Sequence, residues 1–165
     1  MQVRAFLADA VESTGGKLSM LGAGWNRLHV PGFPATHPRM AIGVFLTVHA
    51  GDARSQHLTM RMQGPDGKDR PFGSGPDGTP QITLDANVQV PGSVDDIVVP
   101  MALNIDALMF ERAGEYAFSI QVEGQEEERL AFTVAETPPA LTAPPGAPGQ
   151  PIEPGLPPTT SAGYL

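Results

Sequence analysis

The sequence has no cysteine among its 165 residues. This absence excludes disulfides, thiolate-bound metals, iron–sulfur clusters and a cysteine nucleophile. The chain also lacks any run near the ~18 apolar residues that cross a bilayer as a helix. Its apolar content is 41%, and a domain of this size buries roughly two-thirds of its unfolded surface. The chain can therefore form a packed core without disulfides.

The first residues lack the pattern of a secretory signal. Only four apolar residues lie between Arg4 and Asp9, whereas the apolar part of a signal peptide has ~7–15. We therefore expect a cytoplasmic protein, or a virion-associated one if a phage encodes it, with no membrane contact.

Positive charge is scarce in the second half of the chain. The net charge is −8, and residues 85–136 hold 2 basic and 11 acidic side chains. An acidic surface repels phosphate, so we expect no nucleic-acid partner. The acidic region is either a solvated face or a surface for contact between copies.

Period-two alternation of apolar and polar residues is the main pattern. One apolar set is Met40, Ile42, Val44, Leu46 and Val48, and the others are Leu58, Met60 and Met62; Ile82, Leu84, Ala86, Val88 and Val90; Tyr116, Phe118, Ile120 and Val122; and Leu130, Phe132 and Val134. Such alternation predicts antiparallel strands with one buried face.

Three further segments have a less regular pattern. Val3–Ala10 is apolar on both sides until Asp9, and Lys17–Leu21 is short. Ile97–Ile105 is apolar nearly throughout and contains Pro100, which indicates an edge strand or a bulge.

Turn residues separate the predicted strands. Gly64-Pro65-Asp66-Gly67 and Gly75-Pro76-Asp77-Gly78 repeat one turn pattern, and Glu123–Glu126 predicts a tight hairpin. The only helical pattern is Asp106–Arg112, a short connection. We therefore predict an all-β protein: residues 1–135 form an antiparallel β-sandwich of eight or nine strands, immunoglobulin-like or jelly-roll-like.

Residues 136–165 form a proline-rich tail, or arm. The last 30 residues hold 9 of the 18 prolines and no Lys or Arg. Five prolines recur every third residue, which is the repeat of a polyproline II helix, so they would form one ridge. We expect this ridge and the apolar end of the arm to bind a partner: Pro145, Pro148, Pro151, Pro154, Pro157, Tyr164 and Leu165.

No motif indicates catalysis, a cofactor or a metal site. His49 and His57 supply at most half of a zinc site, with Asp52 the only carboxylate nearby. The pair Gly22 and Gly24 lacks the third glycine and the helix of a dinucleotide-binding loop. Ser74 lacks the flanking glycines of a nucleophile elbow.

Acidic clusters and the single tryptophan need separate interpretations. Asp95-Asp96 and Glu126-Glu127-Glu128 lack the ligand spacing of a calcium loop, which favours solvated turns. Trp25 is either a residue of the core or its rim, which we favour, or an exposed platform for a ligand.

Several stretches resemble a known family. These are Leu7–Val11, Gly15–Leu18, Leu21–Trp25 and Ala113–Tyr116. They are similar to a small, uncharacterised family found mainly in actinobacteria and their phages. The resemblance covers residues 3–135 and implies a β-rich fold without an assigned activity.

We therefore expect a non-catalytic structural or interaction module. One such protein is a decoration-type subunit that docks on a virion or phage-like particle. Its partner would be another protein or a second copy of the chain. A small-ligand or carbohydrate-binding module around Trp25 is the second hypothesis. The third is a hydrolase whose carboxylates come from distant strands.

Overall fold

The computed structural model describes residues 1–53, 55–74, 77–89, 95–123 and 125–138. Within these ranges no helix is long and apolar enough to cross a membrane, and all regular structure is β. The strands are β1 (Gln2–Ala8), β2 (Ala10–Thr14), β3 (Lys17–Leu21), β4 (Arg27–Val30), β5 (Ala35–Val48), β6 (Ser55–Gln63), β7 (Asp69–Arg70), β8 (Gly73–Ser74), β9 (Pro80–Gln81), β10 (Thr83–Gln89), β11 (Ile97–Phe110), β12 (Gly114–Val122) and β13 (Gln125–Glu136). Ten of them have four residues or more.

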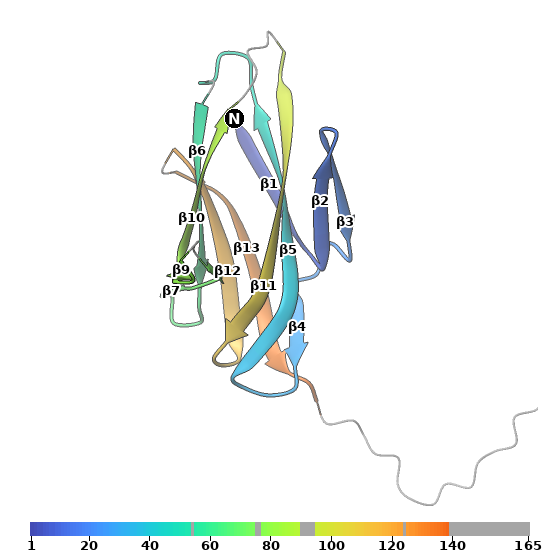
Figure 1. Cartoon of the computed structure of the whole chain (residues 1–165), viewed down its shortest axis with the longest axis vertical. Coiled ribbons are helices and arrows are strands. Elements are labelled where there is room, and N and C mark those ends of the chain that lie inside the picture. The colour runs from blue at the N-terminus through green and yellow to red at the C-terminus, as the bar shows by residue number, and fades with distance from the viewer. Residues whose placement is uncertain (54, 75–76, 90–94, 124, 139–165) are drawn as a thin grey trace, which may run out of the picture.

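Two sheets pack face to face, and the β2–β3 hairpin lies outside one of them (Figure 1). The three-stranded sheet has the order β1-β5-β11 and is antiparallel throughout. The six-stranded sheet has the order β10-β6-β12-β13-β4, with β7 paired to β6. Its β13–β4 pair is parallel. The predicted all-β sandwich is therefore confirmed, with one parallel pair that the sequence did not indicate.

The predicted alternation places the core correctly. The inward side chains of β5, β6, β12 and β13 form one cluster between the sheets. Those no more than 2% exposed include Met40, Ile42, Leu46, Met60, Met62, Phe118, Ile120 and Phe132. Ile82 is an exception, because 48% of it is exposed. It lies at a bend between β9 and β10, so the strand pattern does not determine its direction.

The helix predicted over Asp106–Arg112 is wrong. β11 continues through this segment to Phe110, and Leu108–Phe110 pair with Ala35–His37 of β5. Leu108 and Phe110 are buried, whereas Met109 between them is 59% exposed. Pairing with β5 and burial of every second residue outweigh the local helix propensity of this short segment.

The turns and the edge strand agree with the predictions from the sequence. In the first predicted turn, the Gly67 amide donates to the Gly64 carbonyl at 2.9 Å. The first two residues of the repeated turn lie outside the described residues. β12 and β13 form the predicted hairpin, with Val122 opposite Gln125. Pro100 lies on β11, which is an edge strand of its sheet, as its presence predicted.

Candidate interaction surfaces

The β2–β3 hairpin covers part of the outer face of the three-stranded sheet. Val11 of β2 packs with Ala8 and Ala41 in a small second core, against which Leu18 and Met20 of β3 also pack. Gly43 of β5 allows this close approach. A Cβ atom there would lie 2.6 Å from the Met20 Sδ and 2.8 Å from the Leu18 Cδ2.

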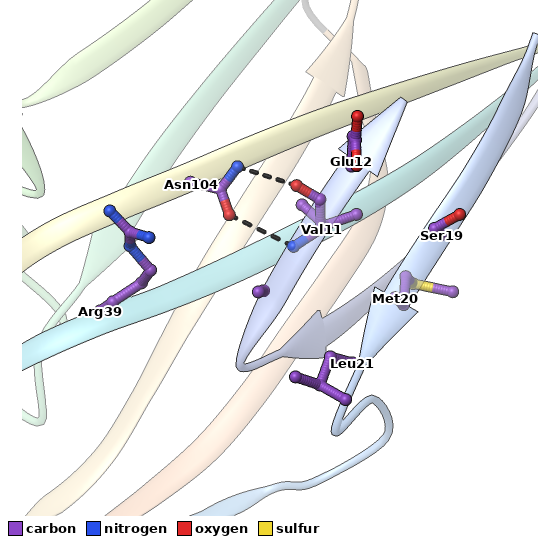
Figure 2. Close-up of a pocket in the computed structure, with 8 residues that line it drawn as sticks. Val11, Glu12, Ser19, Met20, Leu21, Arg39 and Asn104 are labelled. Carbon is purple, nitrogen blue, oxygen red and sulfur yellow. Dashed lines mark hydrogen bonds between the residues drawn. The ribbon is translucent and has the colours of Figure 1, made fainter. Parts of the chain in front are cut away.

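A side chain from the sheet binds the hairpin backbone. Asn104 of β11 accepts a hydrogen bond from the Val11 amide through Oδ1 at 3.2 Å and donates to the Val11 carbonyl through Nδ2 at 2.9 Å (Figure 2). This carboxamide thus takes the place of a neighbouring strand for one residue of β2. Nearby, the Ser13 hydroxyl donates to the Pro100 carbonyl at 3.2 Å.

An open cleft of about 460 Å³ lies where the hairpin joins the sheet. Glu12 and Leu21 from the hairpin and Arg39 from β5 line it (Figure 2). Arg39 Nε lies 2.6 Å from Asp106 Oδ1, and this hydrogen bond lowers the pKa of Asp106. Leu21 is 70% exposed. The lining of the cleft therefore combines both signs of charge with an apolar side chain. Such a mixed lining is less typical of a site for a small anion than of a surface that contacts another protein.

The rest of this outer face carries a group of apolar side chains beside the polar residues Gln2, Arg4 and Thr47. The strand register places Phe6, Phe45, Val98, Pro100 and Ala102 on it; we call these five residues the outer patch. Phe6 is 41% exposed and Val98 is 54% exposed.

The outer face of the six-stranded sheet is polar in comparison. β6 and β10 present His57, Thr59, Arg61, Asp85, Asn87 and Gln89 there. Four of these side chains, those of His57, Thr59, Asp85 and Asn87, are joined by hydrogen bonds, such as Thr59 Oγ1 to Asp85 Oδ1 at 2.9 Å. Arg129 of β13 donates to Gln63 of β6 at 2.9 Å and so spans the intervening β12. The two outer faces of the sandwich therefore differ in chemistry.

A second groove, of about 220 Å³, lies between β1 and β13. Phe6, Trp25, Arg129 and Leu130 are among its lining residues. The Trp25 ring is partly buried and meets Phe132 edge-on, with 5.9 Å between ring centroids. Its indole Nε1 is buried, with no hydrogen-bond acceptor within reach among the described residues. Trp25 therefore lies at the rim of the core and also lines a groove.

The histidines take part in local hydrogen bonds. His49 Nδ1 lies 2.8 Å from Asp96 Oδ2, and His57 Nδ1 lies 3.2 Å from Asn87 Oδ1. His49 and His57 do not meet in a shared site. Across the described ranges, no three His, Asp or Glu side chains gather in a group that could hold a metal ion. The predicted partner-binding residues of the arm, Pro145 to Leu165, lie outside the described residues.

Comparison with known proteins gives one match. A model of a family of unknown function (DUF6941) matches residues 3–135. The chain belongs to this family. The DUF6941 match runs from β1 to residue 135, one residue before the end of β13, over the same residues as the predicted resemblance. No curated protein and no solved structure matches the chain.

Sequence reasoning missed two features of this member of DUF6941. It did not assign Asn104 a role, because its partner Val11 is 93 positions away. It did not predict the outer patch either, although Val3–Ala10 and Ile97–Ile105 are apolar on both sides. Strands with apolar residues on both sides are usually covered on both faces. Their composition could therefore have indicated that the outer face of this sheet carries apolar residues.

Proposed function

We propose that this protein is a non-catalytic interaction module that docks on a larger protein assembly through the outer patch. Apolar surface of this kind, next to polar surroundings, marks sites of protein–protein contact. The observation that carries the proposal is that the hairpin covers only part of the outer face of this sheet and leaves Phe6 and Val98, on its two edge strands, 41% and 54% exposed.

Charge supports a protein as the partner. The chain carries a net charge of −8, which disfavours binding to nucleic acid. Arg4 lies beside the outer patch, because the register places it on the same face as Phe6 and opposite Phe45. The apolar side chains would supply most of the binding energy, and the charge would orient the partner.

The assembly that we propose is a virion or phage-like particle, with the protein as a decoration-type subunit. The family resemblance seen in the sequence, to proteins of actinobacteria and their phages, supports this setting. Under this proposal the protein is found in the cytoplasm before assembly and on the particle afterwards.

Two substitutions on the outer patch test the proposal. We expect Val98→Glu with Ala102→Glu to abolish co-sedimentation of the full chain with particles from the native host, because buried charges without partners oppose docking. The matched control is Gln89→Glu on the polar face, which adds the same charge per site and should leave co-sedimentation intact. Circular dichroism would verify that each variant folds.

Two results would contradict the proposal. One is that the unmodified chain sediments only as free protein. The other is that the outer-patch variant binds particles as well as the control does.

A further inference from the structure

The groove between β1 and β13 is lined by aromatic and apolar side chains. Phe6 stands on β1 and is 41% exposed, Trp25 precedes β4, and Leu130 belongs to β13. Grooves lined by aromatic side chains are the usual binding sites of polyproline II segments, whose conformation is set before they bind. The lining of this groove therefore suits a proline-rich ligand.

The same groove offers unused hydrogen-bond donors. The Trp25 indole Nε1 is buried and has no acceptor among the described residues, and such an unpaired donor is unfavourable. β13 pairs with β4 only from Thr133 onward, so no described strand covers its edge at Arg129–Ala131. A polyproline II chain makes no internal hydrogen bonds, which leaves its carbonyl oxygens available as acceptors.

Charge also matches the arm. The segment 139–165 has Glu153 as its only charged side chain. Arg129 lines the groove and donates to Gln63 through Nη1, and a guanidinium has five N–H donors, so it can also meet a carboxylate.

The direction in which β13 ends favours a groove on another copy. β13 runs from the groove wall at Ala131 to Glu136, and the Thr137 amide donates to the Val30 carbonyl at 2.8 Å at the far end of β4. The described end of β13 thus lies beyond β4, past the stretch Arg129–Ala131 that lines the groove (Figure 1). The segment 139–165 has 27 residues, which span about 84 Å as a polyproline II helix. This length is ample to reach a neighbouring molecule.

Resting on the proposed role as an assembly subunit, we propose that the groove between β1 and β13 binds the proline ridge, Pro145 to Pro157, of a neighbouring copy. The Trp25 ring turns as the ridge binds, so that its indole Nε1, buried in the free protein, donates to a carbonyl of that ridge. Phe6 and Leu130 pack against the proline rings, and Arg129 meets Glu153.

The single tryptophan gives a direct readout of this contact. In the full chain labelled with ¹⁵N, one indole Nε1–H resonance reports on Trp25. We expect this resonance to move downfield and to exchange more slowly with water as protein concentration rises. Replacing Pro148, Pro151 and Pro154 by alanine should remove this concentration dependence. The matched control replaces the off-ridge residues Pro139, Pro144 and Pro158 and should retain it.

A second variant tests the receiving groove. Phe6→Ala should weaken self-association, measured by analytical ultracentrifugation, about tenfold, which corresponds to ~1.4 kcal/mol. Met109→Ala, which removes an exposed side chain of β11 outside this groove, should have no effect.

Three results would overturn the proposal: an indole resonance that does not depend on concentration, equal behaviour of the ridge and off-ridge variants, or unchanged association of Phe6→Ala. Failure of particle docking is seen separately through Val98 and Ala102, which belong to the outer patch but do not line this groove, whereas Phe6 belongs to both surfaces and is tested here without particles. A chain that still binds particles but shows no indole response would refute the arm contact alone.

Discussion

Aromatic side chains form the centre of the core. Phe118 is fully buried, stacks on Phe132 with 5.9 Å between centroids, and meets Phe72 edge-on at 5.6 Å. Phe132 in turn contacts Phe110 and Tyr116. The cluster joins residues of both sheets and the β7–β8 connection, so one ring stabilises several elements.

The first prediction concerns this cluster. Phe118→Ala should lower the free energy of unfolding by ~3–5 kcal/mol, because the lost ring leaves a cavity in a packed core. Chemical denaturation followed by circular dichroism measures the change. Met109→Ala, at an exposed site, should cost below ~1 kcal/mol. A loss for Phe118→Ala as small as that of the control would mean that the ring does not support the core.

Two carboxylates hold the turn after β5. Asp52 accepts a hydrogen bond from the His49 amide at 2.9 Å, and this bond lowers the pKa of Asp52. Asp96 lies against the His49 ring and also accepts from the Ala50 amide at 3.1 Å, and these contacts lower its pKa.

The second prediction follows from the sign of these shifts. A carboxylate with a lowered pKa stabilises the fold above its ordinary pKa of 3.8, and this contribution is lost as pH falls through the folded-state pKa. The stability of the protein should therefore decrease below about pH 4. The neutral variant Asp52→Asn with Asp96→Asn should show a weaker decrease in urea titrations at each pH. A slope equal to that of Asp69→Asn would refute this role.

At the scale of elements, the β2–β3 hairpin is held mainly by contacts between residues far apart in the sequence. Asn104 joins it to β11, and Gly43 lets it approach β5. The hairpin has its own turn, with Gly15 and Gly16 both at positive φ, so it can form locally before it packs.

The third prediction tests the Asn104 contact. Asn104→Ala removes both hydrogen bonds to Val11 and should cost about 1–3 kcal/mol locally. We expect faster amide hydrogen exchange at Val11 and along β3, with the core strands unaffected. Asn87→Ala on β10 is the matched control and should leave exchange in the hairpin unchanged. Equal exchange in both variants would show that the hairpin packs without this side chain.

The strands could be predicted from the sequence wherever one face is buried and the other is wet. β5, β6, β12 and β13 follow the alternation because each places one face in the core. β11 does not follow the alternation, because apolar residues lie on both of its faces. Its last residues, from Asp106 onward, also have a local pattern that predicts a helix. The candidate surfaces depend on residues such as Phe6 and Trp25, which come together only through sheet packing. No local periodicity encodes that contact, so the sequence predicted the sandwich better than its surfaces.

At the scale of the whole molecule, the sandwich and the arm meet at a short junction. β13 ends at Glu136, and Thr137 makes the last described hydrogen bonds, both to Val30. These contacts lie just beyond residue 135, the predicted end of the domain.

The fourth prediction concerns this junction. A fragment of residues 1–138 should fold with the circular dichroism spectrum and melting temperature of the full chain, because it keeps every described contact. The shorter fragment 1–135 should melt at a lower temperature, since it loses the Thr137 bonds to Val30. An unfolded 1–138 fragment would mean that the arm contributes to the fold.

The fifth prediction is that chelation leaves the melting temperature unchanged. The His49 and His57 rings form hydrogen bonds with Asp96 and Asn87. Adding EDTA should therefore remove no metal ion on which the stability of the fold depends. A fall of several degrees in a thermal melt would contradict this expectation.

The pairing of Ser13 with Pro100 has a consequence for the protein at high concentration. β11 is a 14-residue edge strand, and long apolar edges are templates for aggregation. Pro100 has no amide to offer an incoming strand, and Ser13 already occupies its carbonyl. The hairpin thus acts as a gatekeeper that makes strand-to-strand stacking unfavourable at this edge. We therefore expect copies of the protein to resist stacking through β11 even when they are crowded together.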